Sequence, residues 1–514
     1  MEETLAFLLL TVSTFLCSFI IKFLMVSLLS KSSKSSSHPT YGPKCYPIIG
    51  SALSFYANIH RLPEYNTEIL RESPTHTVVL IRPIGGSKTV MTANPDNVEH
   101  ILKTKFHAYP KGPTTHFLLY DLLGNGIFNA DGETWKVQRK ISSHEFNTRS
   151  LRKFVNTAVN SEISSRLLPL LHSAAAGKTT LDLQDVLQRF AFDNICKVAF
   201  GSDPGCLDPA LPPSEFTSAF NLAVSITSDR FKTLFPVVWM IKRALGVGPE
   251  RKLRDAIRVV DEYARNLIRE RRSQPISSTE DLDLLSRFMS TGNVDEDFLR
   301  DIVISFLLAG MDTTSAALTW FFWLLSENER VEEKILKEIA NVKEGVGFDE
   351  AKDLVYLHAA LCEAMRLYPP VPIDSKHAAE DDVLPDGTVV EKGARVIYHP
   401  YGMGRMESLW GKDWSEFRPE RWLQRDENVE GKIKFVPEDP YKYPVFQAGP
   451  RVCLGKEMAF IQMKSIVISV LCRFTVVPAV ADFQPVFELS LTSKMKGGFP
   501  VRIEERKECA IAEE

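Results

Sequence analysis

One long apolar segment constrains the fold of this chain more than any other feature. Residues 301–326, "DIVISFLLAGMDTTSAALTWFFWLLS", would be apolar on every face of a helix. Such a helix is stable either across a membrane or through the middle of a large core. Its centre carries Asp312, and strongly charged segments lie close on both sides. Because a carboxylate in lipid is costly, the sequence favours a central core helix over a second membrane span.

The N-terminus holds a different apolar run. Residues 5–29, "LAFLLLTVSTFLCSFIIKFLMVSLL", are long enough to cross a bilayer. Two glutamates precede the run and lysines lie within and after it, so the positive-inside rule leaves the following chain cytosolic. A signal peptide would need positive charge before the run and a small-residue cleavage site after it. We therefore expect a retained anchor over residues 1–29 rather than a signal or transit peptide.

The remaining chain divides into a short connector and one large domain. Residues 30–50 form a Ser/Lys linker and then a proline-rich neck, and residues 51–514 have an ordinary globular composition. The net charge of −4 does not indicate the positively charged surface that binds nucleic acid, so we exclude nucleic acid as a partner. The eight cysteines form no CxxC pair, so they are expected to be thiols.

The periodicity of the body predicts a mainly α fold with a small β-sheet. Two β-rich runs flank Gly85 and Gly86 in "HTVVLIRPIGGSKTVMTANP", which is a hairpin signal, and "GARVIYHPYGMG" is strand-like. Helical periods dominate between them, as in "LQDVLQRFAFDNICKVAF" and "ERKLRDAIRVVDEYARNLIRERR". The sheet must therefore be assembled from segments far apart in the chain.

Two helical pairs suggest buried charge. Glu363 and Arg366 in "LCEAMRLYPP" share a helix face, and Arg421 in "FRPERW" offers a second cation, so a buried cluster of three charges competes with a surface salt bridge. Trp135 and Arg139 in "ETWKVQRK" also share a face, and both are pure donors. They suit a carboxylate on a flat cofactor, unless they are an ordinary aromatic residue and a solvated arginine.

The stretch "FQAGPRVCLG" near the C-terminus decides between these interpretations. Phe446, Gly449, Arg451, Cys453 and Gly455 match the haem-thiolate pattern FxxGxRxCxG. A thiolate on iron needs backbone N–H groups turned toward its sulfur, and glycines allow a loop that tight. Arg451 would offset propionate charge and Phe446 would pack on the ring. We interpret Cys453 as the metal ligand.

With these motifs the chain resembles a microsomal cytochrome P450 from the neck to about Pro500. The resemblance implies the cytochrome P450 fold and haem b as the cofactor. It also implies a structural triad of Glu363, Arg366 and Arg421, and an acid and alcohol pair of Asp312 and Thr313 for oxygen activation. The cofactor-binding residues that it implies are Cys453, Trp135, Arg139, Arg451, Phe446, Gly449 and, more weakly, Lys376.

Thr313 should also shape the central helix. Its hydroxyl can bond back to the carbonyl of Ala309, and Gly310 weakens the helix by about 1 kcal/mol relative to alanine. We therefore expect the helix to open locally beside the iron.

Two longer stretches narrow the resemblance. "MGRMESLWGKDWSEFRPERWL" and "HEFNTRSLRKF" resemble the plant fatty-acid ω-hydroxylases, a group that also contains jasmonoyl-isoleucine hydroxylases. The expected partners are then a lipid-like substrate, O2 and NADPH-cytochrome P450 reductase, at the endoplasmic reticulum membrane. The expected topology is single-pass with a cytosolic catalytic domain. Free fatty acid and jasmonoyl conjugate stay open as substrates, as do the position hydroxylated and the extent of oxidation.

Two other functions stay open as well. A haem-thiolate lyase or isomerase would rearrange hydroperoxides, but such enzymes commonly lose the threonine that this chain retains. A non-catalytic haem-binding membrane protein would not need the Asp312–Thr313 pair.

The resemblance also suggests which residues contact the substrate and the reductase. The substrate-facing candidates are Phe117, Leu118, Phe306, Ala309, Ile373 and Met495. Possible partners for a substrate carboxylate are Lys111, Arg230 and Lys494. A basic patch for the reductase would comprise Lys136, Lys140 and Lys456.

Overall fold

The computed structural model describes most of the large domain. The described residues are 41–46, 49–81, 88–208, 211–212, 214–233, 235–273, 283–292, 294–340, 348–426 and 433–506. The predicted anchor at residues 1–29 and the linker up to residue 40 lie outside them and stay predictions.

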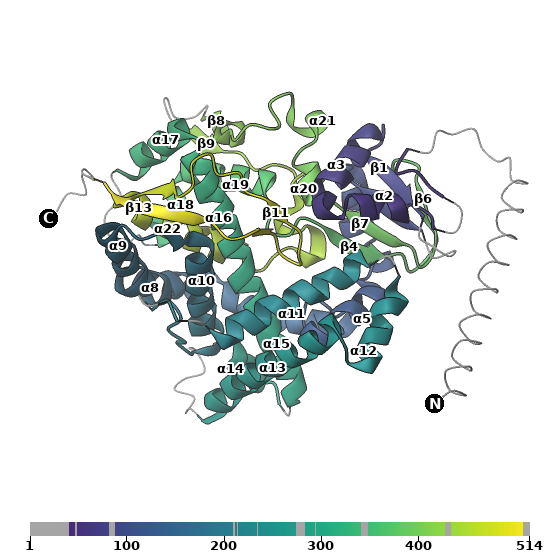
Figure 1. The fold of residues 1–514 in the computed structure, drawn as a ribbon, viewed down its shortest axis with the longest axis horizontal. Coiled ribbons are helices and arrows are strands. Elements are labelled where there is room, and N and C mark those ends of the chain that lie inside the picture. Colours follow the sequence, from purple (N-terminus) through teal and green to yellow (C-terminus); the bar gives the residue numbers. More distant parts are fainter. Residues whose placement is uncertain are drawn as a thin grey trace, which may run out of the picture.

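Helices make up most of the domain, as the periodicity predicted (Figure 1). The helices that build the first half are α2 (Ala52–Ala57), α3 (Leu62–Glu72), α4 (Pro95–Glu99), α5 (Gly112–Leu123), α6 (Gly132–Ser143), α7 (Thr148–Phe154), α8 (Asn160–Glu162), α9 (Leu168–Gly177), α10 (Leu183–Phe200), α11 (Glu215–Lys232) and α12 (Pro236–Leu245). Those of the second half are α13 (Pro249–Ser273), α14 (Leu284–Met289), α15 (Glu296–Leu307), α16 (Thr313–Ser326), α17 (Glu329–Ile339), α18 (Phe348–Asp353), α19 (Val355–Leu367), α20 (Pro400–Met403), α21 (Glu407–Trp410) and α22 (Lys456–Leu471).

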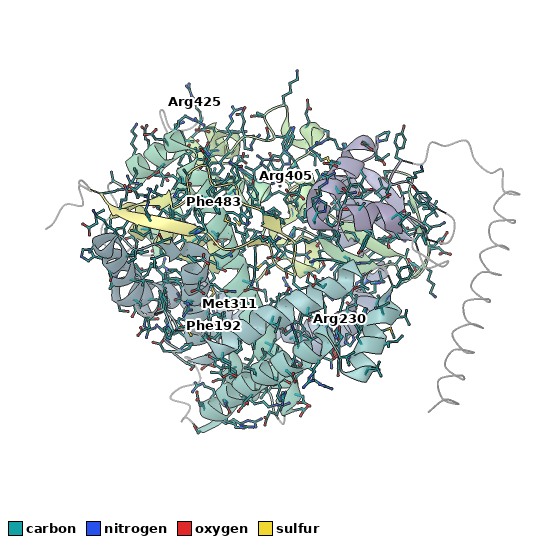
Figure 2. All side chains as sticks on the ribbon, viewed as in Figure 1. Phe192, Arg230, Met311, Arg405, Arg425 and Phe483 are labelled. Atoms are coloured by element: carbon teal, nitrogen blue, oxygen red, sulfur yellow. The ribbon has the colours of Figure 1, made fainter. Side chains whose placement is uncertain are left out.

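The apolar segment forms the central helix of the core. α15, a π-helical turn over Leu308–Asp312 and α16 run as one helix, Glu296–Ser326, through the middle of the molecule (Figure 1). Within the described part of the chain it is the one helix long and apolar enough to cross a membrane, but 83% of its most apolar window is buried in the protein. The preference for a core helix is confirmed. Figure 2 places Met311 and Phe192 near the centre, where this helix contacts α10.

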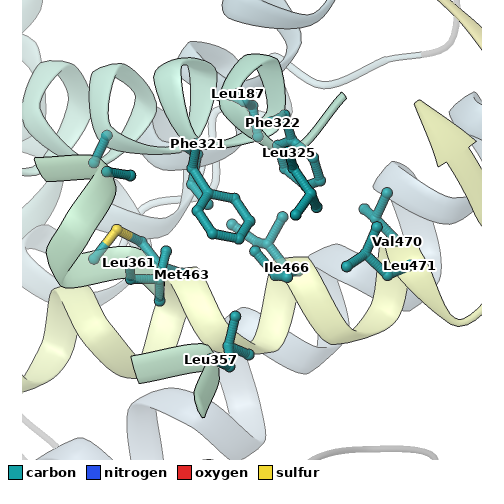
Figure 3. Packing of buried hydrophobic residues seen from close by; sticks show 14 of the residues in the cluster. Leu187, Phe321, Phe322, Leu325, Leu357, Leu361, Met463, Ile466, Val470 and Leu471 are labelled. Atoms are coloured by element: carbon teal, nitrogen blue, oxygen red, sulfur yellow. The ribbon is translucent and has the colours of Figure 1, made fainter. Parts of the chain in front are cut away.

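The largest hydrophobic cluster lies around three helices. Residues of α16, α19 and α22 interdigitate there, as Figure 3 shows for Phe321, Leu361 and Ile466. These side chains are fully buried or nearly so. The packing gives the central helix and the start of α22 a rigid support, and the loop that carries Cys453 leads directly into α22.

The sheets join segments that are far apart in the chain. β1 and β2 form the predicted antiparallel hairpin, although residues 82–87 between them are outside the described part. β2 then pairs in parallel with β7, and β7 pairs antiparallel with β4, giving the order β1-β2-β7-β4. This sheet and the central helix flank the same cavity.

The four-stranded sheet comprises β1 (Thr77–Leu80), β2 (Thr89–Thr92), β7 (Arg395–Tyr398) and β4 (Asp374–His377). A three-stranded sheet comprises β10 (Phe474–Pro478), β13 (Pro500–Glu505) and β3 (Leu181–Asp182). The two-stranded pairs are β11 (Phe487–Glu488) with β12 (Lys494–Met495), β5 (Asp382–Val383) with β6 (Val389–Val390), and β8 (Leu423–Arg425) with β9 (Ile433–Phe435).

Candidate active site

A large cavity lies between the central helix and the loop that carries Cys453. Its volume is about 770 Å³. Ala309, Gly310 and Thr313 line it from the central helix, and Phe446 and Cys453 line it from the opposite side. The structure therefore brings the predicted oxygen-activating threonine and the predicted thiolate ligand to one cavity.

The cysteine loop is folded tightly around its own backbone. The N–H of Cys453 donates to the carbonyl of Phe446 at 2.8 Å, and the N–H of Gly455 donates to the Cys453 sulfur. The thiol is accessible from the cavity, although burial within the protein raises its pKa while Gly455 and Arg139 oppose that shift. An N–H turned toward the sulfur is what a metal-bound thiolate needs.

Gly449 serves this loop through its backbone. Its φ is +65°, and a Cβ there would lie 2.1 Å from the carbonyl oxygen of Leu102. Glycine is required both for the left-handed conformation and for the close approach. Gly449 therefore shapes the loop; it is not among the residues that line the cavity.

We expect Gly449→Ala to sharply reduce the yield of folded protein. A left-handed non-glycine residue costs about 1–3 kcal/mol, and the clash with the Leu102 backbone adds to that cost because a carbonyl cannot rotate away. Thermal unfolding and the amount of haem retained on purification measure the effect. Gly387→Ala is the matched control, since its φ is +86° but no atom lies within 4 Å of the new Cβ. Equal effects of the two variants would contradict the role of the close approach.

A cluster of donors lies beside the cysteine loop. The Arg451 guanidinium stacks over the Trp135 ring at 4.5 Å and donates to the Asp131 carboxylate at 2.7 Å. The Arg139 guanidinium lies 5.9 Å from the same ring and donates to the carbonyl of Val452 at 2.8 Å. Trp135, Arg139 and Arg451 all line the cavity. The predicted grouping of these three residues is therefore present.

Lys376 is buried behind the cavity wall. Its ammonium group has no hydrogen-bond partner among the described residues and lies 3.7 Å from the Asp374 carboxylate. Burial, together with the charge of Lys111, lowers the pKa of Lys376 to about 7. Lys376 is not itself among the cavity-lining residues, whereas Asp374 and Ser375 are.

Asp374 is the centre of a polar network that the sequence did not reveal. Its carboxylate accepts from Lys111 Nζ at 2.7 Å, from the Tyr398 hydroxyl at 2.8 Å and from the Gln447 amide. Burial opposes its ionisation, but the Lys111 and Lys376 ammonium groups outweigh that and hold its pKa well below the usual value. No local spacing signals this network, because its members come from four distant segments.

The central helix opens where the cavity touches it. The Thr313 hydroxyl donates to the Ala309 carbonyl at 2.6 Å, and Leu308–Asp312 form a π-helical turn. Gly310 is needed in this turn because a Cβ would lie 2.6 Å from Ile195 of α10. The predicted back-bond and local opening are both present.

The Asp312 side chain does not face the cavity as the Thr313 side chain does. Its carboxylate accepts from the Gln188 amide at 2.7 Å and from the Thr492 hydroxyl at 3.1 Å, and the side chain is buried. Asp312 does not line the cavity. Gln188 and Thr492 are thus site residues that sequence reasoning missed, since neither lies near Asp312 in the chain.

The predicted charge cluster is buried and fully formed. Arg366 donates twice to the Glu363 carboxylate, at 2.8 Å each, and both side chains are 0% exposed. Arg421 and the Trp422 indole donate to the same carboxylate at 2.7 and 3.0 Å. Arg366 also donates to backbone carbonyls of the segment that precedes Arg421. The interpretation as a surface salt bridge is wrong.

Three of the six predicted substrate-facing residues line the cavity, and three do not. Phe306, Ala309 and Ile373 line the cavity. Phe117 instead contacts Trp239 at the surface, and Met495 is buried in the main hydrophobic cluster. Leu118 is also not among the lining residues. Phe117 and Leu118 belong to α5, a helix that presents other residues to the cavity, including Thr115 and Leu119.

The site residues fit a haem. An accessible thiol with an N–H turned toward its sulfur faces a wall of small residues, and two arginines and an indole supply donors for propionates. The buried Lys376 ammonium group lies 3.7 Å from Asp374 but has no hydrogen-bond partner in the described part of the chain, so it fits an anionic group as well. Cys453 would hold the iron, while Trp135, Arg139, Arg451 and Lys376 would hold or neutralise the carboxylates.

This fold and this site define a haem-thiolate monooxygenase, and the chain belongs to the cytochrome P450 family. The family described as Cytochrome P450 matches residues 41–499. The resemblance seen in the sequence is therefore confirmed, as are haem b as the cofactor and the assignment as an oxidoreductase.

Relatives from two plant species align with almost the whole chain. It is 55% identical over 492 residues to Cytochrome P450 94A2 of Vicia sativa, covering 94% of this chain and 95% of the relative. It is 52% identical over 501 residues to Cytochrome P450 94B3 of Arabidopsis thaliana, covering 96% and 98%. It is 50% identical over 490 residues to Cytochrome P450 94B1 of the same species, covering 95% and 96%.

Proposed function

We propose that this enzyme hydroxylates the ω end of fatty-acid-like substrates, with O2 and with electrons from NADPH-cytochrome P450 reductase. The observation that carries the proposal is the cavity, which is large and lined mostly by apolar side chains such as Phe306, Leu308 and Ile373. An acyl chain needs such walls. Free fatty acids and jasmonoyl-isoleucine share this chemistry, so both are substrates to be tested.

Residues of the central helix would take part in proton delivery in this reaction. When bound, the haem supplies reductive activation of O2, which the thiolate favours by donating electron density. The Thr313 hydroxyl lines the cavity and donates its own hydrogen to the Ala309 carbonyl, so its oxygen is left as an acceptor that can orient a proton-carrying water there. Asp312 does not line the cavity, so it would take part in proton delivery through its hydrogen bonds with Gln188 and Thr492.

We expect Thr313→Ala to keep haem and substrate binding but to divert electrons from hydroxylated product to peroxide. The reason is that the cavity would lose the hydroxyl oxygen that orients the proton-carrying water there. NADPH consumed, peroxide released and alcohol formed are measured in one reconstituted reaction, where product per NADPH should fall about 10-fold or more. Thr313→Ser keeps the hydroxyl and is the control. Unchanged coupling in Thr313→Ala would leave Thr313 as a helix-packing residue.

The proposed location is the endoplasmic reticulum membrane, with residues 1–29 as a single anchor and the catalytic domain in the cytosol. The surface of the described domain supports contact with a membrane. α12 exposes a row of large apolar side chains, and α2 exposes others on the same side of the molecule (Figure 1). Those residues are Val237, Val238, Met240, Ile241 and Leu245 on α12, and Leu53 and Tyr56 on α2.

A docking surface for the reductase is proposed beside the cysteine loop. Lys136 and Lys140 of α6 and Lys456 at the start of α22 are exposed, and Lys456 lies over the Phe446 ring at 5.9 Å. Positive charge there would attract an acidic partner.

A reconstituted reaction tests the proposed function. The full-length protein, reductase and NADPH are incubated with a fatty acid or with jasmonoyl-isoleucine, and the products are identified by mass spectrometry. Terminal alcohols that require NADPH and O2 support the proposal. Rearrangement of a fatty-acid hydroperoxide without either would indicate a lyase or isomerase. A haem protein that consumes no NADPH with any of these compounds would be a non-catalytic binder.

A further inference from the structure

A cluster of charged residues joins helices that line the active-site cavity. Arg230 of α11, which the sequence offered as a partner for a substrate carboxylate, has a side chain that is 2% exposed and does not line the cavity. Its guanidinium is bound by Glu250 of α13 at 2.6 Å and by Asp121 of α5 at 2.8 Å. Arg243 of α12 also binds Asp121, at 2.5 Å. We call these four residues the wall cluster.

The charge of Arg230 is fully used within the wall cluster. Burial disfavours the charged form of Arg230, but its hydrogen bonds with Glu250 and Asp121 outweigh burial and raise its pKa. Lys494, another candidate partner for a carboxylate, donates to Asn221 at 2.7 Å and does not line the cavity either. The wall cluster is therefore no ligand site, and its role follows from the helices that it joins.

Aromatic rings extend the wall cluster onto α12. The Arg230 guanidinium lies over the Trp239 ring at 4.5 Å, and the Arg243 guanidinium lies 5.7 Å from the Phe117 ring. The two rings contact each other, with centroids 5.4 Å apart. Trp239 and Arg243 are four residues apart, so they share one face of α12. That face is fixed to α5 and α11, and Figure 2 shows Arg230 near the end of α11, close to α12.

The same contacts lie beside residues that face the cavity. Arg230 donates to the carbonyl of Leu118 on α5 at 3.2 Å. Asp121 lies three positions after Leu118, within the same turn of α5. The cavity-lining residues of these two helices are Thr115, Leu119 and Leu123 on α5, and Ser228 and Phe231 on α11.

α5 is also held by the central helix. Arg300 of α15 donates to the backbone carbonyl of Asp121 at 3.2 Å. The Asp301 carboxylate accepts from the N–H of Asn125, two residues after α5 ends, at 2.7 Å. Asp121 is therefore joined by its carboxylate to α11 and α12, and by its backbone to the helix that carries Thr313. The separation of α11 from the central helix is set through α5.

We propose that Asp121 and Arg230 are positioning residues, which fix the width of the cavity and so hold a long hydrocarbon chain in one register relative to Cys453. An apolar chain makes no directional contacts, so its register depends on how rigidly the surrounding wall is held. Neither residue touches the ligand; both act through neighbours such as Leu119 and Phe231. The effect on the register of oxidation rests on the proposed function, whereas the effect on the wall does not.

The test compares two ligands of the full-length, haem-loaded protein, imidazole and 1-dodecylimidazole. Both bind the haem through the same ring nitrogen and shift its absorbance, but only 1-dodecylimidazole has a chain that contacts the wall. We expect Asp121→Asn to weaken 1-dodecylimidazole about 5- to 50-fold and imidazole less than about 2-fold. Asp121→Glu keeps the carboxylate and should retain most of the affinity for 1-dodecylimidazole.

Asp255→Asn is the matched control. Asp255 of α13 binds Arg258 of the same helix at 2.6 Å, and its side chain is 48% exposed. The substitution removes an equally short ion pair without separating two helices. It should change the affinity for neither ligand.

The position of hydroxylation provides a second readout, which rests on the proposed function. In Asp121→Asn, hydroxylation of hexadecanoic acid should spread from the terminal carbon to its neighbours. KM should rise by a larger factor than kcat falls, because the groups at the reacting end of the cavity are unchanged.

The outcomes separate the positioning role from the proposed function. If Asp121→Asn weakens both azoles equally, or neither, the positioning role is wrong, whatever the protein oxidises. If the selective loss of 1-dodecylimidazole occurs but the wild-type enzyme does not oxidise hexadecanoic acid, the positioning role stands and the proposed function fails.

A second variant decides the question should Asp121→Asn not retain haem. Arg230→Lys keeps a positive charge beside Glu250, but an ammonium group cannot reproduce the planar fork that binds Glu250, Asp121 and the Leu118 carbonyl together. It should also weaken 1-dodecylimidazole selectively, by about 5-fold or more. Unchanged affinity for 1-dodecylimidazole in Arg230→Lys would overturn the proposal.

Discussion

Cys453→Ser is expected to abolish the reduced carbon-monoxide spectrum that marks a thiolate-bound haem, together with all measurable turnover. Cys453 is the described cysteine that lines the active-site cavity, and the Gly455 N–H points to its sulfur. A serine hydroxyl is a far weaker donor to iron, so the electron density that favours O–O cleavage would be lost. Absorbance of the reduced, carbon-monoxide-treated protein and a reconstituted activity assay measure the result.

Cys362→Ala is the control for this variant. Cys362 is buried in α19 and lies outside the cavity lining, and burial raises its pKa far above the usual value. The alanine variant should retain the thiolate spectrum, with at most a modest loss of stability. A thiolate spectrum that survives in Cys453→Ser would show that another residue binds the iron.

Glu363→Gln is expected to destabilise the whole domain. The Glu363 carboxylate is the shared acceptor for Arg366 and Arg421, and both it and Arg366 are fully buried. Burial already lowers the pKa of Arg366, and the carboxylate opposes that shift. Breaking a buried ion pair by removing one partner costs about 3–5 kcal/mol, because the other charge stays buried without compensation.

Thermal inactivation rates and the yield of haem-loaded protein measure this loss. Glu68→Gln is the control, because it removes a carboxylate from an ion pair with Arg61 in which both side chains are about half exposed to water. It should change the inactivation rate little, since surface ion pairs contribute little to stability. Similar rates for the two variants would contradict a structural role for the buried cluster.

The cysteine loop, the central helix and the first hairpin could be predicted from the sequence because each depends on neighbours in the chain. The turn around Cys453 needs particular residues within ten positions, and the π-helical turn follows from Gly310 and the Thr313 back-bond to Ala309. The triad was predictable in part, because Glu363 and Arg366 lie on one helix face. Local geometry of this kind depends on residues that are close together in the sequence.

Contacts between distant segments could not be predicted in the same way. Arg395 lies beside Thr89 only because β2 and β7 are parallel neighbours, and Asp312 meets Gln188 only because α10 crosses the central helix. The charge of Arg230 or Lys494 says nothing about its partner, and both proved to be held away from the cavity. A single sequence shows which groups are ionisable. Strand pairing and helix packing determine which of these groups share a site, and both depend on the burial of the whole core.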